Sequence, residues 1–131
     1  MPYQTTDYLD QKILKHTFGI AAYTAPSAVY VGLFTSDPTK AGAGTELAAG
    51  GYSYARKLLT PVLDGTGKQV NQSTLLRWDN LPAAVITHAA VFDALSAGNM
   101  LWQGPLVASK TVAAGDSLEI AATTGLTAGY L

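Results

Sequence analysis

Apolar positions along this chain change their spacing once, near its beginning. Residues 5–19, TTDYLDQKILKHTFG, carry apolar side chains at helical intervals: Leu9 and Ile13 share one face, and Leu14 and Phe18 lie beside it. A Thr or Asp suits the N-cap of such a helix, acidic residues follow in its first turn, and the final glycine suits its C-cap. The pattern therefore predicts one short amphipathic helix.

After Pro26 the patterned segments are typical of strands. Residues 29–35, VYVGLFT, are rich in β-branched and aromatic side chains and apolar at nearly every position, which predicts a strand covered on both faces. Gly, Pro, Asn and Asp turn signals separate the later segments. Further strands are predicted at residues 52–60, 74–80, 85–94 and 100–107, with two or three short strands at 110–131. Pro105 inside one of these segments indicates an edge strand or a bulge.

Short strands with frequent turns predict a mainly β fold. We expect an antiparallel β-sandwich with one short N-terminal α-helix. The whole chain, residues 1–131, is expected to form a single domain, with an N-terminal arm and helix at 1–25 and the sandwich at 26–131. The most apolar strands supply the expected core. Its predicted members are Val31, Leu33, Val91, Phe92 and Leu101.

The connection between the first two predicted strands, residues 35–52, is rich in glycine and alanine and carries few charges. A phosphate-binding loop needs a full glycine motif and a helix N-terminus. Here Gly42 and Gly44 lack the third glycine of a dinucleotide motif, because Leu47 stands at its position, and no predicted helix follows. The two remaining interpretations are a slack linker and a loop that another protein orders.

The charge content changes the picture of the surface. Charged residues make up only 13% of the chain, against about 25% in ordinary domains. Eight basic and nine acidic residues leave a net charge of −1, so little repulsion opposes association. The same balance argues against nucleic-acid binding, which depends on many basic contacts to phosphates. Since no apolar run approaches the roughly 20 residues of a membrane span, and no secretory signal opens the chain, we also expect no membrane partner.

The sequence offers little for catalysis or metal binding. Its only histidines are His16, in the predicted helix, and His88, in a predicted strand. His16 suits the C-terminus of a helix electrostatically, and His88 is best interpreted as a boundary imidazole satisfied by a neighbour. Asp37, Asp93 and Asp116 stand at turn positions, where Asp caps its own backbone. We therefore expect no catalytic residue, no metal ligand, no cofactor and no enzyme activity.

Four segments, taken together and in order, carry a resemblance. They are YLDQKILKHTFG, AYTAPSAVYVGLFTSDPTKAGAGTELAAGGYSYAR, ITHAAVFDALSAGNMLWQGPL and KTVAAGDSLEI, and they span nearly the whole chain. The chain thus resembles a family of small tailed-phage virion proteins, described as tail fibre or decoration proteins. The resemblance implies a structural component of a virion, made in the host bacterial cytoplasm and assembling in many copies as a homo-oligomer. It is also similar to the jelly-roll cement proteins that clamp major capsid subunits together.

These observations favour a partner-ordered loop at residues 35–52. The segment has few large apolar side chains to pack on its own domain, and its glycines and alanines let the backbone of a partner approach closely. Leu47 is its one sizeable apolar anchor. The predicted contact residues are Ala41, Gly42, Gly44, Leu47, Gly50, Gly51 and Tyr52.

Three functions remain open on the sequence alone. The first, which we favour, is a capsid decoration or cement protein that binds and stabilises the lattice of the major capsid protein. The second is a tail-associated or tail-fibre accessory protein that contacts tail proteins. For this second function, an exposed aromatic cleft suited to sugar would draw on Tyr52, Tyr54, Trp78 or Trp102. The third is an enzyme or an unrelated cytoplasmic binding module.

Overall fold

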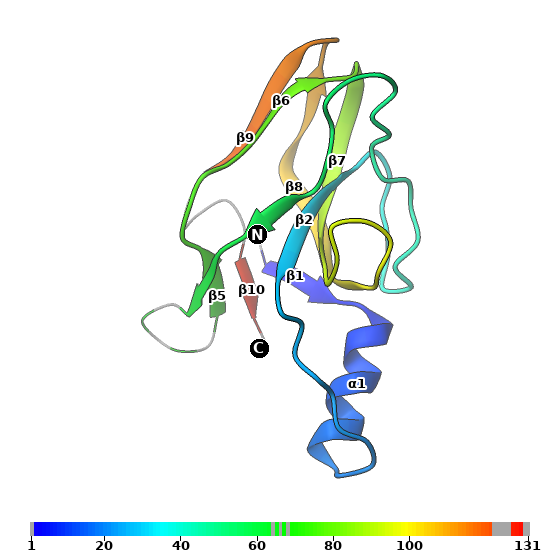
Figure 1. Cartoon of the computed structure of the whole chain (residues 1–131), viewed down its shortest axis with the longest axis vertical. Helices are drawn as coiled ribbons and strands as arrows, with labels where there is room; N and C mark the ends of the chain where they lie inside the picture. The colour runs from blue at the N-terminus through cyan, green and yellow to red at the C-terminus, as the bar shows by residue number, and fades with distance from the viewer. Residues whose placement is uncertain (1, 64, 66, 68, 122–126, 130–131) are drawn as a thin grey trace.

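The computed structural model describes residues 2–63, 65, 67, 69–121 and 127–129 of the chain (Figure 1). The described residues form mainly strands and one short N-terminal helix, so the predicted fold class is confirmed. The elements in chain order are β1 (Pro2–Thr5), α1 (Asp7–Thr17), β2 (Val29–Phe34), β3 (Lys57–Leu59), β4 (Pro61–Leu63), β5 (Gln69–Gln72), β6 (Leu76–Leu81), β7 (Ala84–Phe92), β8 (Met100–Val112), β9 (Asp116–Ile120) and β10 (Thr127–Gly129).

The described strands form two hydrogen-bonded sheets of unequal size. Eight strands pair in the order β3-β2-β7-β8-β1-β10-β5-β4, and β6 pairs with β9. The neighbouring strands are antiparallel except for β1 and β10, which run parallel. The two ends of the large sheet, β3 and β4, are separated in the sequence only by Thr60. One short stretch of chain therefore supplies both edges of this sheet.

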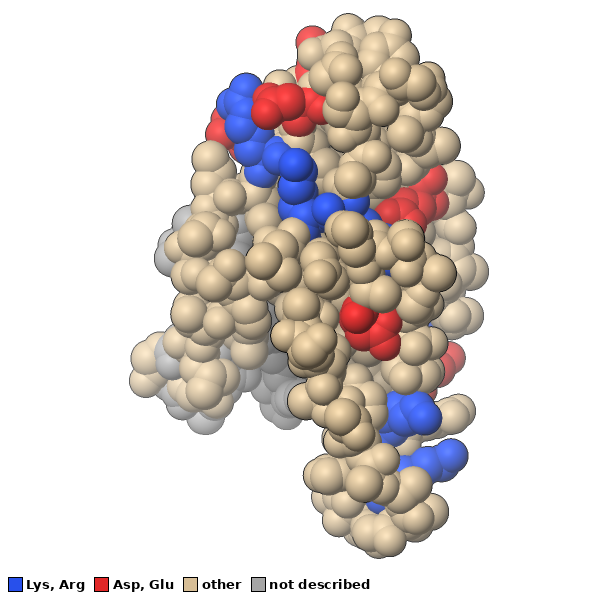
Figure 2. Space-filling model, in the orientation of Figure 1, with Lys and Arg blue, Asp and Glu red and all other residues tan. Residues whose placement is uncertain are grey.

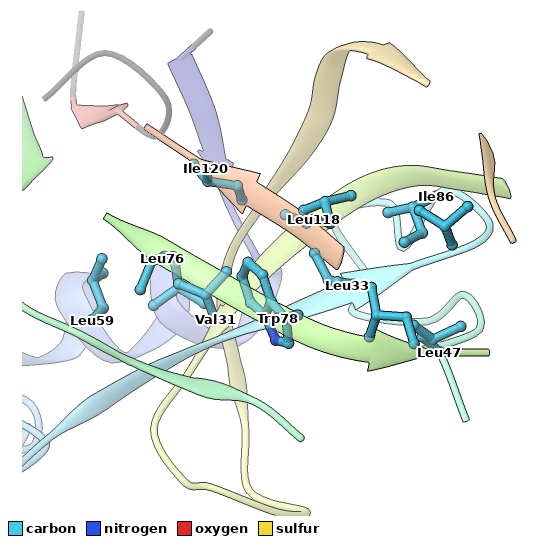
Figure 3. Packing of buried hydrophobic residues seen from close by; sticks show 13 residues of the cluster. Val31, Leu33, Leu47, Leu59, Leu76, Trp78, Ile86, Leu118 and Ile120 are labelled. Atoms are coloured by element: carbon cyan, nitrogen blue, oxygen red, sulfur yellow. The ribbon is translucent and has the colours of Figure 1, made fainter. Parts of the chain in front are cut away.

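A shared hydrophobic core joins the two sheets into a two-layer sandwich. One cluster of buried side chains comes from β2 and β7 of the large sheet and from β6 and β9 of the small sheet (Figure 3). Trp78 of β6 is the largest fully buried side chain, and its indole N–H donates to the Ala55 carbonyl oxygen at 2.9 Å. The predicted core is confirmed, because all of its members are buried: Val31, Leu33, Val91, Phe92 and Leu101.

The opposite face of β2 and β7 is covered as well. Phe34, Ala90, Phe92 and Met100 form a second buried cluster, in which the rings of Phe34 and Phe92 stack with their centroids 6.0 Å apart. The predicted burial of the first long strand on both faces is thus confirmed. On β7, a shift in register just after Ile86 changes which positions face the main core, as expected at a bulge.

Several strand boundaries differ from the prediction. Of the strand expected at residues 52–60, only β3 is paired in the sheet, because the preceding groups bond elsewhere: the Ser53 N–H, for example, donates to the Asn80 carbonyl oxygen at 3.0 Å. β8 extends five residues beyond its predicted end at Val107, to Val112. Pro105 lies at the register shift between β7 and β8, and β8 is not an edge strand, so of the two alternatives that this proline indicated the bulge is confirmed. β1, β4 and β5 were not predicted, and β1 lies inside the interval expected to be an arm.

Candidate interaction surfaces

The glycine-rich segment at residues 35–52 is held by its own domain. Its residues 45–47 run antiparallel beside the end of β2: the Thr35 N–H donates to the Thr45 carbonyl oxygen at 3.0 Å, and the Leu47 N–H to the Leu33 carbonyl oxygen at 2.8 Å. Leu47 is only 7% exposed and belongs to the main core. The expectation that Leu47 anchors a partner is therefore corrected: backbone pairing with β2 turns this side chain inward.

A partly buried ion pair fixes the same segment to the outer face of β2. The side chain of Arg56 is 8% exposed and binds both carboxylate oxygens of Glu46, at 2.9 Å each. The guanidinium also lies 3.5 Å from the centroid of the Phe92 ring. The Tyr54 hydroxyl donates to the Glu46 carboxylate at 2.7 Å. Burial is the main cause that raises the pKa of Tyr54, and this hydrogen bond raises it further. These contacts hold the segment in place from within the protein, whereas a slack linker would lack such contacts.

The other predicted contact residues remain at the surface. Gly44 has φ +78°, and a Cβ there would lie 2.9 Å from the Pro38 Cα, so the fold of the segment itself requires this glycine. The exposed members of the predicted set are Ala41, Gly42, Gly44, Gly50, Gly51 and Tyr52. Their contact with a partner stays a prediction.

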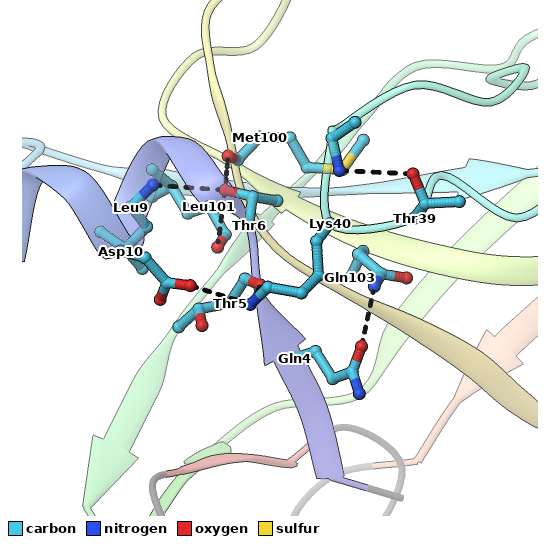
Figure 4. A network of polar contacts seen from close by, with 11 residues as sticks. Gln4, Thr5, Thr6, Leu9, Asp10, Thr39, Lys40, Met100, Leu101 and Gln103 are labelled. Carbon is cyan, nitrogen blue, oxygen red and sulfur yellow. Dashed lines mark hydrogen bonds and ion pairs between the residues drawn. The ribbon is translucent and has the colours of Figure 1, made fainter.

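The turn of this segment also contacts the start of α1 (Figure 4). The Nζ atom of Lys40 donates to Asp10 at 2.8 Å and to the Thr5 carbonyl oxygen at 2.9 Å, and the Lys40 carbonyl oxygen accepts from the Asp7 N–H at 2.8 Å. The hydrogen bond from Lys40 lowers the pKa of Asp10. The buried Thr6 caps the helix by accepting from the Leu9 N–H at 3.4 Å. These contacts therefore fix the first turn of α1 to the glycine-rich segment and to the end of β1.

The four aromatic residues considered for sugar binding do not form an exposed platform. Trp78 is buried in the core, Tyr54 is occupied by the Glu46 network, and Trp102 packs against the core from its edge. Of these four, Tyr52 alone is exposed. The expectation of an exposed aromatic cleft is thus corrected, because three of the four side chains that would line it pack in or against the core or bind Glu46.

The histidines and turn aspartates have structural partners. His88 Nδ1 lies 2.8 Å from the Thr87 hydroxyl, and His16 Nδ1 accepts from the Tyr23 N–H at 3.1 Å. The predicted capping by aspartates is confirmed, since each accepts a backbone N–H within its own turn: Asp37 from Thr39, Asp93 from Asn99 and Asp116 from Ala113. In the described part of the chain, no three His, Asp or Glu side chains gather in a way that could hold a metal ion.

The far end of α1, together with the turn that follows it, exposes three large apolar side chains. Leu14, Phe18 and Ile20 are 57%, 73% and 74% exposed, and we call them the α1 end surface. The Gly19 N–H donates to the His16 carbonyl oxygen and the Ile20 N–H to the Lys15 carbonyl oxygen, with Gly19 at φ +71°. This is a Schellman motif, which fixes the backbone of the turn. The turn therefore holds these side chains in place, and the part of the chain that the structure describes leaves them largely exposed.

Helical periodicity placed Leu14 and Phe18 beside the apolar face, but sequence could not show that they stay exposed. Among the residues of α1, Leu9 alone is buried, because the helix meets the sheet near its first turn and then extends away from it (Figure 1).

A second apolar surface lies where the two sheets separate. Between β8 and β9 there is an open groove of about 230 Å³, below the usual volume of small-molecule sites. We call it the β8–β9 groove; its apolar lining is Leu106, Val107, Ala108, Leu118, Ile120 and Ala121. Val107 is 86% exposed. Lys110 and Glu119 also line it, and Glu119 pairs with Arg77 at 3.6 Å.

The visible surface carries few charges. In Figure 2, basic and acidic side chains adjoin one another in a band across the upper half and form small areas below it, and most of the face is uncharged. Among the described residues, no helix has the length and apolar character required to cross a membrane.

Comparisons with known proteins identify the family. A search of curated proteins finds no match. Residues 4–127 match the family described as podophage GP4 fiber I protein gp80, a span that includes α1, the glycine-rich segment and the β8–β9 groove. The resemblance to small tailed-phage virion proteins is thereby confirmed. The chain belongs to this podophage fibre protein family and is a phage structural protein.

Proposed function

We propose that this protein is a non-enzymatic fibre component of a phage tail, made in the host cytoplasm and built into the virion through protein–protein contacts. The description of its family names a fibre protein, and this favours the tail-fibre alternative over capsid decoration. The observation that carries the proposal is the α1 end surface: three large apolar side chains stand exposed on a rigid turn. Exposed apolar groups held in one conformation are typical of surfaces that another protein covers.

The exposed part of the glycine-rich segment is a second proposed contact. Because its backbone is already ordered by Glu46, Arg56 and Lys40, a partner would bind it without first ordering it. Its contribution would come from close approach to the exposed positions, which are Ala41, Gly42, Gly44, Gly50, Gly51 and Tyr52.

Location in the particle tests the proposal. Antibodies raised against the purified protein are applied to intact virions and visualised with gold particles by electron microscopy. We expect gold at the tail. Gold distributed over the capsid would support decoration of the major capsid protein and contradict a fibre role. Virions that carry no gold, or in which mass spectrometry does not detect the protein, would contradict both roles.

A further inference from the structure

The α1 end surface is bordered by positive charge. Lys15 precedes Phe18 by three residues, a spacing at which two side chains are neighbours on a helix, and Lys12 lies about one turn earlier. Neither lysine forms an ion pair with a residue that the structure describes, and the Lys12 ammonium lies 5.4 Å from the centroid of the Tyr8 ring. The end of α1 therefore combines exposed apolar side chains with two cations that lack an acidic partner in the described part of the chain.

This positive charge contrasts with the rest of the chain. Residues 11–36 contain both lysines and no acidic residue, whereas the remaining residues hold six bases and nine acids. Of the acids near α1, Asp10 is bound by Lys40, and Asp93 accepts from the Asn99 N–H within its own turn. In Figure 2, the end of the molecule that α1 forms shows basic side chains beside an uncharged tip. A partner that matches this surface therefore needs apolar groups at its centre and acidic groups around them.

We propose that the α1 end surface binds an apolar pocket with an acidic rim on a different virion protein. This inference deepens the proposed function, on which it rests, by naming the chemistry of the partner. Phe18 is the central anchor, Leu14 and Ile20 extend the apolar contact, and the two lysines meet the acidic groups at its edge. Burial of the apolar side chains supplies the affinity, and the charges at the edge orient the contact and select the partner.

A second copy of this chain fits that description poorly. The lining of the β8–β9 groove includes one base, Lys110, and one acid, Glu119, and this acid already pairs with Arg77. Close to the groove, Asp116 accepts from the Ala113 N–H within its own turn. This apolar surface therefore presents no excess of free acidic groups, and the charges favour a different virion protein as the occupant.

Photo-crosslinking in the virion identifies what Phe18 contacts. The full chain with Phe18→p-benzoylphenylalanine, a photoreactive residue, is supplied during phage growth, purified virions are irradiated, and mass spectrometry identifies the crosslinked peptides. We expect a crosslink to a different virion protein, in an apolar segment in which acidic residues outnumber basic ones. The matched control places the same photoreactive residue at Leu95, which is 55% exposed and outside the α1 end surface, and it should not crosslink to that segment. A Phe18 crosslink to a second copy of this chain, a crosslink to a segment without an excess of acid, or no crosslink would each overturn the proposal.

Neutralisation of the two lysines tests the acidic rim. The variant Lys12→Gln/Lys15→Gln keeps the apolar side chains, and glutamine suits a helix about as well as lysine does. The matched control, Lys57→Gln/Lys110→Gln, changes the net charge equally on β3 and β8. Each variant is supplied in equal amount with the unaltered protein, circular dichroism checks its folding, and mass spectrometry compares incorporation into virions. We expect at least about fivefold less incorporation of the test variant and no loss for the control. Equal incorporation of the two variants would contradict the acidic rim, and the crosslinking test depends on neither of them.

The two proposals fail separately. If gold labels the tail while Phe18 crosslinks to a segment without an excess of acid, the inference about the partner is wrong and the fibre role stands. Gold over the capsid contradicts the fibre role whatever Phe18 contacts.

Discussion

Replacement of Leu47 by alanine tests whether the glycine-rich segment is packed by its own domain. The side chain is 7% exposed and lies in the main core with Leu33. Full burial of a leucine contributes about 1.5–3 kcal/mol, and the cavity left by Leu→Ala raises the total to about 2–5 kcal/mol. Because Leu47 enters the core from a surface segment that can relax, we expect a loss of about 2–3.5 kcal/mol in the free energy of unfolding.

Urea unfolding followed by tryptophan fluorescence measures this loss. For an m-value of about 2 kcal/mol/M, in the middle of the usual range, the midpoint should fall by about 1–2 M. Leu95→Ala is the matched control, since this leucine is 55% exposed, and it should change stability by less than about 0.5 kcal/mol. If Leu47→Ala costs no more than the control, the segment does not pack on its own domain, and the earlier interpretation of a partner-ordered loop would return.

Three further predictions concern the outer face and the root of α1. Phe92→Ala should cost about 3–5 kcal/mol in urea unfolding, because the ring is buried under Arg56; a loss below about 1 kcal/mol would contradict its packing. Arg56→Ala should cost about 2–4 kcal/mol by leaving Glu46 partly buried without its partner, and adding Glu46→Gln should recover part of the loss; no recovery would mean that the ion pair is not the cause. The hydrogen bond from Lys40 lowers the pKa of Asp10 below 3.8, so its contribution is complete above that pH and disappears as the pH falls through the lowered value. Asp10→Asn should therefore reduce the acid-induced loss of stability; an unchanged pH profile would exclude a role for this pair.

The fold could be predicted wherever the signal is local. The helix follows from periodicity and capping residues, and the strands at 29–35 and 85–94 follow from long runs of apolar residues. β1, β4 and β5 could not be found in this way, since each has only three or four residues, and β1 and β5 also pair with β10, which is distant in the sequence. Their positions are decided by the whole sheet rather than by their own side chains.

The candidate site could be predicted only in part. Composition correctly indicated a neutral surface, but it suggested that residues 35–52 had nothing to pack on. Backbone pairing beside β2 and the Glu46–Arg56 ion pair order this segment, and neither depends on the large apolar residues that sequence reasoning looked for. The exposure of Phe18 was equally hidden, because it depends on how far α1 extends beyond the sheet.

A cryo-electron microscopy reconstruction of the virion tests the central claim most directly, because it places the chain and shows what covers α1. The account predicts density for this sandwich in the tail, with Phe18 of each copy buried against a neighbouring subunit. Density for the protein over the capsid lattice, or in the tail with Phe18 exposed to solvent, would contradict it.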